Sequence, residues 1–313
     1  NNIFKVNLLS ADKNYRSICH QIKKYKPKYF LINNYKTYLK VKRKFKKDKI
    51  KILNKMKNLK IKKSDVTVSA IPGLAGLQPT ISMIKFSKKL LIANKESIIC
   101  GWHLIKKNAN VNNTKIIPVD SEHYSIKELI KNHKIEEVEK IYLTASGGPF
   151  LNKTLSKIKN AKPLDALKHP KWKMGKKISV DSATLMNKIL ELIEAQKLFN
   201  LPENKIAIII HPESLVHAIV VLKNGLLKFI YHSTTMKIPL ANAIFDGNLE
   251  IKNFINQSER NKIKNSINDL SFQEVNQTKF PIIKLKARAN EYPSTSIIIN
   301  AANEVLVDYF LQK

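Results

Sequence analysis

The densest group of chemically active side chains lies in an otherwise apolar stretch, residues 178–195, with the sequence ISVDSATLMNKILELIEA. Five polar residues fall close together within it: Asp181, Ser182, Asn187, Lys188 and Glu191. The pattern predicts a buried strand that turns into a helix over 183–199, with Ser182 at the helix N-cap. Free amide groups at a helix N-terminus favour an anion such as phosphate. Asn187, Lys188 and Glu191 would share one helix face, so a carboxylate would lie one turn beyond that anion.

Two further carboxylates, Asp120 and Glu122, occur in PVDSEHYSI, which follows an apolar run. If strand geometry continues through residue 122, both side chains point the same way and converge on one point. Hard divalent cations take oxygen ligands of this kind. A pair of solvated surface acids is the alternative, but two acids together carry more weight in so basic a chain. Glu191 is the natural third ligand of a metal site.

Two glycine-containing segments have the composition of ligand-binding loops. LTASGGPF, residues 143–150, ends a strand with a hydroxyl and two glycines, which suits a backbone that wraps a small ligand; an ordinary turn is the alternative. HPKWKMGKK, residues 169–177, carries His169, Trp172 and Met174 ahead of a strand-like run. Large apolar side chains on a mobile loop are typical of a lid that closes over a substrate. A loop fixed by a buried Trp172 explains that segment equally well.

The composition limits the class of protein. The chain has 313 residues, of which 43% are hydrophobic and 8% aromatic, as in globular proteins of two or three domains. Neither a membrane-spanning run nor a secretion signal is recognisable, so we expect a soluble, cytoplasmic protein with no membrane partner. The two cysteines, Cys19 and Cys100, form no close pair, which predicts buried, reduced thiols rather than a disulfide or a zinc site.

The net charge of +32 could indicate nucleic acid, acidic lipid or an anionic small molecule as a partner. Lysine, isoleucine and asparagine replace much of the usual arginine, alanine and glycine, as in proteins encoded by AT-rich genes. The densest basic run, residues 38–63, has apolar residues at helical spacings, so a solvated helix face is favoured. We therefore expect no nucleic-acid partner and lysines scattered over the surface.

The elements that must position these side chains begin with an alternation of β-rich runs and amphipathic stretches. The β-rich runs are residues 4–11, 28–34, 66–73, 90–95 and 115–120. Such alternation predicts a parallel sheet with helices on both faces, in which ligands bind beyond the carboxyl ends of the strands. The strand ends at 71–73, 93–96 and 119–122 would therefore face the ligand.

From about residue 140, hairpins mix with the predicted helix. The strand-like runs are residues 140–148, 176–181, 205–212 and 214–233, and the last contains Asn224-Gly225, a strong hairpin signal. We expect an α/β parallel-sheet domain over 1–119, an α+β domain over 120–250, and a polar segment that becomes helical again over 251–313. The chain opens into a strand without an initiator Met and closes on an uncapped helical pattern, so both ends are expected to be truncated.

Six segments, in their order along the chain, resemble the 1-deoxy-D-xylulose 5-phosphate reductoisomerase family. They are LLIANKESIICG, PVDSEHYSI, LTASGGPF, HPKWKMGKKISVDSATLMNKILELIEA, IHPESLVHAIV and INAANEV. The resemblance covers essentially the whole chain. It implies a homodimeric enzyme of the non-mevalonate isoprenoid pathway that isomerises 1-deoxy-D-xylulose 5-phosphate and reduces the intermediate aldehyde to 2-C-methyl-D-erythritol 4-phosphate. NADPH and a divalent metal, with magnesium, manganese or cobalt as candidates, would be the cofactors. Residues 1–119 would then be a Rossmann-like NADPH-binding domain, residues 120–250 the α+β catalytic domain, and residues 251–313 a connecting segment with the start of a C-terminal helical domain.

The resemblance also implies roles for individual residues. The metal ligands would be Asp120, Glu122 and Glu191. The phosphate would be bound by Ser146, His169, Ser182, Asn187 and Lys188. Other substrate oxygens would be bound by Lys95, Ser121, Glu122 and Glu191. The catalytic groups would be Lys95, Glu122 and His169. NADPH would be contacted by Lys13, Asn14, Asn94, Glu96 and Gly175. The lid would carry Trp172 and Met174, while Asp181 has no assigned role.

The nucleotide-binding end departs from the family. A dinucleotide-binding half normally opens with a strand and a glycine-rich turn, but none of the eight glycines lies in the first 72 residues. In SADKN, residues 10–14, Asp12 stands where the family usually has glycine, and its charge would oppose the 2′-phosphate of NADPH, although Lys13 could offset it. We expect the 313-residue chain to bind NADPH poorly or not at all, and the intact protein to be active.

Two other classes of protein stay open at this point. A different nucleotide-dependent dehydrogenase, acting on a semialdehyde or a sugar phosphate, would share the alternating first half but would not need Asp120, Glu122 and Glu191 together. A basic nucleic-acid-binding protein would bind DNA or RNA in a salt-sensitive way.

Overall fold

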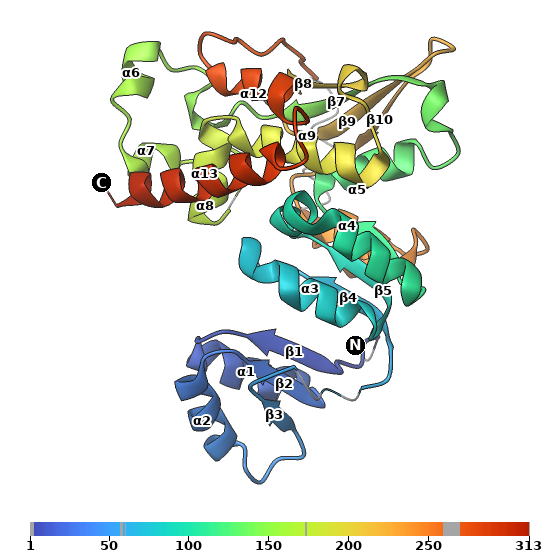
Figure 1. The fold of residues 1–313 in the computed structure, drawn as a ribbon, viewed down its shortest axis with the longest axis vertical. Coiled ribbons are helices and arrows are strands. Elements are labelled where there is room, and N and C mark those ends of the chain that lie inside the picture. Colours follow the sequence, from blue (N-terminus) through green and yellow to red (C-terminus); the bar gives the residue numbers. More distant parts are fainter. Residues whose placement is uncertain (1–2, 57–58, 60, 173, 259–269, 313) are drawn as a thin grey trace. The chain divides into compact units, whose positions relative to one another are not determined.

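The computed structural model describes residues 3–56, 59, 61–172, 174–258 and 270–312, in two compact units (Figure 1). Unit 1 is Asn1–Asp65 and unit 2 is Val66–Lys313. The expected domain boundaries at residues 119 and 250 both lie inside unit 2, and they stay a prediction.

Unit 1 is a parallel sheet in the order β1-β2-β3. Its elements are β1 (Leu8–Ala11), α1 (Tyr15–Tyr25), β2 (Tyr29–Ile32), α2 (Tyr35–Lys44) and β3 (Lys51–Leu53). Apolar residues of both helices and of β2 form its core: Ile18, Cys19, Ile22, Phe30, Ile32, Val41 and Phe45. In the described residues of the basic run 38–63, the helix ends at Lys44. Ile50 and Ile52 alternate and pack on this core, which favours a strand there.

A second parallel sheet, in the order β4-β5-β6, starts two residues before unit 2 and belongs otherwise to that unit. Its elements are β4 (Ser64–Ser69), the short helix η1 (Leu74–Gly76), α3 (Leu77–Ile84), β5 (Ser87–Ile92), α4 (Lys95–Val111) and β6 (Lys115–Pro118). Ile92 of β5 pairs with Pro118 of β6, so these neighbouring strands end side by side. The chain therefore delivers the start of α4 and the residues after β6 to the same edge of the sheet, as the alternating pattern predicts.

A mixed sheet in the order β10-β9-β7-β8 follows. The elements of this part are α5 (Ser121–Leu129), η2 (Ile135–Glu137), β7 (Val138–Ala145), η3 (Gly148–Phe150), α6 (Leu155–Lys159), α7 (Pro163–Ala166), α8 (Lys176–Ala183), α9 (Met186–Phe199), η4 (Glu203–Lys205), β8 (Ile206–Ile210), β9 (Val216–Leu222) and β10 (Leu227–Tyr231). β7 and β8 are parallel, whereas β9 runs antiparallel to β7 and to β10. The predicted hairpin is confirmed, with Gly225 at a φ of 86° in its turn.

Helices α5 and α9 share one core with this sheet, visible in Figure 1 where α9 lies across β7 and β8. Ile126 and Leu129 come from α5, and Leu192 and Ala195 come from α9. Because these apolar positions are three residues apart, they lie on one face of each helix. The first turn of α5 and the first half of α9 are left to carry the polar residues of the site.

The last part of unit 2 contains α10 (Lys237–Phe245), η5 (Ile251–Asn253), η6 (Pro281–Lys284), α12 (Leu285–Arg288) and α13 (Thr295–Leu311). The helix expected at the end of the chain is confirmed as α13, while residues 259–269 of the expected connecting segment lie outside the described residues. Both cysteines are free thiols; Cys19 is buried and Cys100 only partly so. Among the described helices, none has the length and apolar character needed to cross a membrane.

Two predictions about residues 178–195 were wrong. Residues 178–181 belong to α8 and not to a strand, because Val180 and Ala183, three positions apart, pack together against Val307 of α13. The following helix begins at Met186, and its N-cap is Leu185, not Ser182. Leu185 has a φ of 63° and is buried in a cluster that includes Ala145, Ile210 and Phe280. This packing holds Leu185 in a left-handed conformation that costs a side-chain-bearing residue about 1 to 2 kcal/mol.

Candidate metal and substrate site

The three expected metal ligands lie together in unit 2. One oxygen from each of Asp120, Glu122 and Glu191 lies within 4.8 Å of the others. The reason differs from the prediction, because β6 ends at Pro118 and strand geometry does not continue to residue 122. Asp120 is instead the N-cap of α5, where Oδ1 accepts from the Glu122 amide at 3.3 Å, and Glu122 lies in the first turn. Glu191 reaches them from the middle of α9.

Two lysine ammonium groups stand between these carboxylates. Lys95 Nζ is 3.1 Å from Asp120 Oδ2 and 2.8 Å from Glu191 Oε1, and it donates to Asn187 Oδ1 at 2.9 Å. Lys188 Nζ is 2.6 Å from Glu191 Oε2 and also donates to Glu122. Lys95, Lys188, Glu122 and Glu191 are all buried. The site is therefore a closed network of opposite charges.

Ser121 and Asn187 complete the contacts around the carboxylates. Ser121 Oγ donates to Glu122 Oε2 at 2.5 Å, and the Asn187 amide nitrogen donates to Glu191. The structure thus brings together Lys95, Ser121, Asn187 and Lys188 with the three acids, as expected for one site.

The network sets unequal proton affinities. Burial and the neighbouring Glu191 raise the pKa of Glu122 to about 8, although Lys188 opposes this. Burial alone would raise the pKa of Asp120, but Lys95 and His123 hold it well below its usual range. Burial alone would lower the pKa of Lys95, whereas Asp120 and Glu191 raise it well above its usual range. At neutral pH Asp120 and Lys95 are charged, and Glu122 holds a proton that a bound cation would displace.

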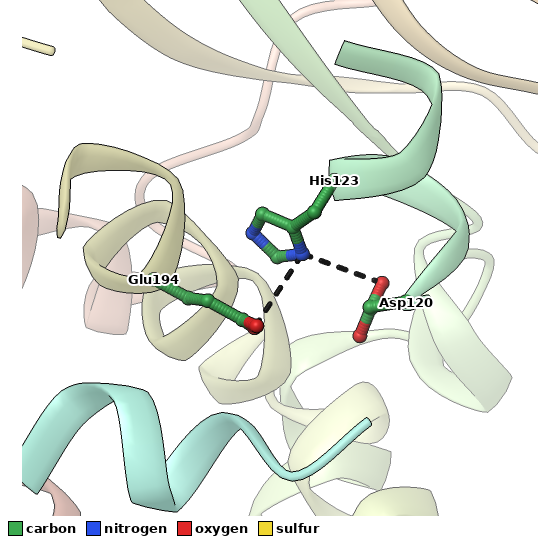
Figure 2. A group of neighbouring side chains, drawn as sticks. All are labelled: Asp120, His123 and Glu194. Atoms are coloured by element: carbon green, nitrogen blue, oxygen red, sulfur yellow. Dashed lines mark ion pairs between the residues drawn. The ribbon is translucent and has the colours of Figure 1, made fainter. Parts of the chain in front are cut away.

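A second cluster adjoins Asp120, as Figure 2 shows. His123 Nδ1 lies 3.7 Å from Asp120 Oδ1 and 3.4 Å from Glu194 Oε2. These three residues also offer ligand atoms within 4.8 Å of one another. Burial alone would lower the pKa of His123, but Glu194 and Asp120 raise it to about 9, and burial with the Asp120 charge raises that of Glu194 to about 7.

The sequence reasoning assigned no role to His123 or Glu194. The available signal was spacing: His123 is three residues after Asp120, and Glu194 is three residues after Glu191, which places each pair on one helix face.

His169 and Ser146 form a second part of the site. His169 Nδ1 accepts from the backbone amides of Lys171 at 3.2 Å and Trp172 at 2.9 Å. Burial and the charge of Lys188 lower the pKa of His169 to about 4, so the ring is neutral at pH 7. Because Nδ1 accepts, Nε2 carries the ring proton and donates to Ser146 Oγ at 3.0 Å. The neutral ring thus presents a fixed donor toward Ser146.

The backbone of Gly148 lies directly against Ser182. Gly148 has a φ of 63°, and a Cβ there would be 2.6 Å from the Ser182 carbonyl oxygen. Gly148 of LTASGGPF therefore permits close packing on the end of α8, which brings Ser182 next to the loop of Ser146. Ser182 is half-buried near the end of α8, so it does not cap a helix N-terminus as predicted.

The expected lid loop packs on the mixed sheet through Trp172. Its ring centroid is 6.1 Å from that of His217 on β9, in an edge-to-face arrangement. His217 in turn stacks on His232 at 4.0 Å. Met174 is half-buried. His217 and His232 were also missed from the sequence, where nothing but their position in β-rich runs marked them.

The expected NADPH residues are divided between the two units. Lys13 and Asn14 belong to unit 1, where Asn14 caps α1 by accepting from the Ser17 amide at 3.0 Å. Asp12, the departure from the family, accepts from the Asn33 amide nitrogen at 3.1 Å. The described part of unit 1 offers exposed polar groups but no glycine turn against which a pyrophosphate could lie.

Three expected NADPH residues belong to unit 2. Asn94 is buried and caps α4, accepting from the Ser97 amide at 2.6 Å while its own nitrogen donates to Gly73 O at 2.9 Å. Glu96 is also buried, 3.3 Å from Lys177 Nζ. Gly175 is an exposed residue at the start of α8, where a Cβ would meet no atom within 4 Å. Asn94 and Glu96 are therefore already engaged in contacts within the protein. Of these three residues, Gly175 alone has open space around it.

Asp181, which had no predicted role, has a structural one. It is buried, 2.9 Å from Lys177 Nζ, and accepts from the Asn303 amide nitrogen at 2.8 Å. It therefore links α8 to α13.

The residues fit a hard divalent cation. Four buried or nearly buried carboxylates, Asp120, Glu122, Glu191 and Glu194, face two ammonium groups and one imidazole. Clustered carboxylate oxygens suit magnesium or manganese, which bind through such ligands.

Family models match most of the chain. The 1-deoxy-D-xylulose 5-phosphate reductoisomerase model matches residues 1–101, the model of its C-terminal domain matches 116–199, and a further DXP reductoisomerase C-terminal domain matches 233–313. The reductoisomerase of Pelagibacter ubique is 45% identical over 98% of this chain and 80% of its own length. That of Wolbachia pipientis wMel is 41% identical over 99% of this chain and 79% of its own.

Solved structures of 1-deoxy-D-xylulose 5-phosphate reductoisomerases have the same fold as this chain. A crystal structure of DOX-P reductoisomerase in complex with NADPH, fosmidomycin and magnesium has a TM-score of 0.88 and 31% identity, covering 99% of this chain and 79% of that one. The Zymomonas mobilis enzyme in complex with NADPH has a TM-score of 0.83 and 29% identity over 99% of this chain and 80% of that one. The predicted fold class, a Rossmann-like parallel α/β part followed by mixed-sheet and helical parts, is confirmed. This chain belongs to the 1-deoxy-D-xylulose 5-phosphate reductoisomerase family, whose members are NADPH-dependent oxidoreductases.

Proposed function

We propose that Asp120, Glu122 and Glu191 hold the divalent cation with which this reductoisomerase converts 1-deoxy-D-xylulose 5-phosphate to 2-C-methyl-D-erythritol 4-phosphate in isoprenoid precursor synthesis. The observation that carries this assignment is the convergence of the three carboxylates within 4.8 Å, from α5 and α9. When bound, the cation supplies Lewis-acid polarisation of the substrate carbonyl and NADPH supplies the hydride.

The chain's own residues bind and orient the substrate. Ser146 and the neutral His169 offer hydroxyl and N–H donors for a phosphate, beside Ser182. Lys188 lies close enough to His169 to lower its pKa, and it also touches Glu122, so its ammonium group can serve the phosphate and the carboxylates. Phosphate binding at this end holds the reacting carbons in place, and that binding energy can be used at the reacting centre.

Lys95 and Ser121 complete the proposed contacts with substrate oxygens. Lys95 keeps its proton, because the surrounding carboxylates raise its pKa, so it acts as a donor that stabilises negative charge on an oxygen. Glu122, whose raised pKa lets it hold a proton before the cation binds, would give up that proton to the cation and bind as a carboxylate. Trp172 and Met174, on the loop ahead of α8, would exclude water by covering the substrate.

NADPH oxidation by the purified full-length protein, with 1-deoxy-D-xylulose 5-phosphate and magnesium, tests this function. We expect turnover that stops when the metal is chelated and returns when magnesium or manganese is added. Turnover that continues without any divalent metal would contradict the proposed role of the carboxylates.

We also propose that the protein is a homodimer in the cytoplasm. Exposed apolar side chains on β10, Leu227 and Phe229, support a protein partner at that edge of the mixed sheet. Light scattering after gel filtration measures the mass; a monomer at micromolar concentration would contradict the dimer.

A further inference from the structure

We propose that His123 and Glu194 form a positioning pair that holds Asp120 and the backbone of Glu191 in the arrangement that binds the divalent cation. The proposal rests on the metal site assigned above and extends it, because neither residue is one of the three ligands. Figure 2 shows the pair beside Asp120.

The His123 ring links two of the proposed ligands. Its Nε2 is 2.8 Å from the backbone oxygen of Glu191, and since a carbonyl oxygen can only accept, Nε2 carries a proton. Its Nδ1 faces Asp120 Oδ1 at 3.7 Å and Glu194 Oε2 at 3.4 Å. One ring therefore connects the N-cap of α5 to the middle of α9.

The Asp120 carboxylate is consequently held through both of its oxygens. Oδ1 accepts from the Glu122 amide at 3.3 Å and faces His123, while Oδ2 faces Lys95 at 3.1 Å. The orientation of this carboxylate is therefore set before a cation binds. Residues that orient metal ligands from behind typically contribute about 10 to 100-fold to metal affinity.

Glu194 fixes which ring atom faces Asp120. His123 and Glu194 are 0% and 1% exposed, so bulk water does not reach either side chain. Neither His123 Nδ1 nor Glu194 Oε2 has a hydrogen-bond partner of good geometry in the part of the chain that the structure describes. The two atoms nevertheless lie within 4 Å of each other, and His123 Nδ1 also lies within 4 Å of Asp120 Oδ1. A ring turned by 180° would place a carbon atom against two carboxylates, and the buried Glu194 charge disfavours that orientation.

The same three atoms could instead hold a second cation, because Asp120, His123 and Glu194 offer ligand atoms within 4.8 Å. The surrounding charges favour positioning. Lys95 Nζ already lies 3.1 Å from Asp120, so a second cation that shared this carboxylate would stand beside an ammonium group.

Binding of Mn²⁺ to the 313-residue chain, followed by the electron paramagnetic resonance signal of free Mn²⁺, tests the proposal without requiring turnover. Wild type should bind one ion. Glu194→Gln and His123→Gln should raise the Kd about 10 to 100-fold, because the first removes the charge behind the ring and the second removes the group at the Nδ1 position. His123→Asn places an amide near the Nδ1 position and should recover most of the affinity.

Thr114→Val is the matched control for loss of a buried polar group. Thr114 Oγ1 lies 2.8 Å from Ile84 O and 2.9 Å from Ser87 O, away from the carboxylates. The variant should lose stability to urea and keep the wild-type Kd for Mn²⁺. In the full-length protein, Glu194→Gln should raise the Mn²⁺ concentration for half-maximal rate by the same factor as the Kd, while kcat at saturating Mn²⁺ changes little.

The outcomes separate the two proposals. An unchanged Kd in folded Glu194→Gln and His123→Gln overturns the positioning pair alone. Two ions in wild type and one in Glu194→Gln also overturn it, in favour of a second cation site. Absence of Mn²⁺ binding in wild type overturns the proposed metal site itself. If Glu194→Gln does not fold, the ratio of the Kd values of His123→Gln and His123→Asn decides.

Discussion

Glu191→Gln is the change that most directly challenges the proposed site. Glu191 is 2% exposed, and its oxygens accept from Lys95 at 2.8 Å, from Lys188 at 2.6 Å and from Asn187. Glutamine keeps the shape and one acceptor oxygen but removes the charge. It also turns an NH₂ group toward a lysine.

The expected loss of stability is limited, because each lysine keeps a second carboxylate partner. Removing one partner of a buried ion pair costs about 3 to 5 kcal/mol when the other is left alone. Here Lys95 retains Asp120 at 3.1 Å, and Lys188 retains Glu122. Glu122 also ionises more readily, because Glu191 is one of the groups that raise its pKa. We therefore expect a smaller loss, about 1 to 3 kcal/mol in the free energy of unfolding.

The affinity for the metal should be affected more strongly than the free energy of unfolding. Removing a residue that only supports a ligand costs about 10 to 100-fold in affinity, so losing a ligand should cost about 100-fold or more. Urea unfolding gives the stability, Mn²⁺ titration gives the affinity, and NADPH oxidation by the full-length protein gives the turnover, which should be abolished at ordinary metal concentrations. Glu137→Gln, at an exposed residue that pairs with His133, is the control and should retain all three. Wild-type turnover in Glu191→Gln would refute the proposed mechanism.

Three further predictions concern packing, pH and the nucleotide. Gly148→Ala should lower the free energy of unfolding in urea by on the order of 3 kcal/mol, because its Cβ would lie 2.6 Å from the Ser182 oxygen and its φ is 63°. Gly225→Ala is the control: its φ is 86°, but the space around it is open, so the loss should be about 1 kcal/mol. Equal losses would contradict the packing argument. Burial lowers the pKa of both His217 and His232, and it holds the pKa of His217 well below the usual value. The unfolded chain therefore takes up protons first, so the free energy of unfolding should be fully present above about pH 6.5 and fall with pH below it, by up to about 1.4 kcal/mol per unit for each ring. His232→Gln should make the pH dependence of the urea midpoint shallower, and an unchanged slope would count against this. Fluorescence titration of the 313-residue chain with NADPH should show weak or no binding, since no glycine turn occurs in its first 72 residues; tight binding would refute that expectation.

Much of the fold could be predicted because its signals are local. Alternating β-rich and amphipathic runs indicated the parallel strands, and Asn224-Gly225 indicated the hairpin. Residues 178–181 were mistaken for a strand because β-branched residues favour strands. In the fold these residues are helical, and this places Val180 and Ala183 together against Val307 of α13. The N-cap at Leu185 depends on Ile210 and Phe280, which are distant in the sequence.

Some residues of the candidate site could likewise be chosen from the sequence, whereas others depend on tertiary contacts. Asp120, Glu122 and Glu191 could be chosen by residue type and spacing, since carboxylates in a basic chain stand out. The contact of His123 with Glu194 joins two helices and has no counterpart in local sequence. Asp181 drew attention by its type, yet its partners are Lys177 and, far along the chain, Asn303. Residue type thus indicated the chemistry, while tertiary contacts decided which polar residues serve it.

The two ammonium groups among the carboxylates make metal uptake an exchange of counterions. Lys95 and Lys188 already neutralise Glu191, so the buried carboxylate has positive partners before any metal arrives. Each lysine becomes available to the substrate only when its carboxylate gains another positive partner. The same side chains would then serve in turn as internal counterions that keep the site folded before metal binds and as ligands of the substrate, which couples substrate binding to prior occupation of the metal site.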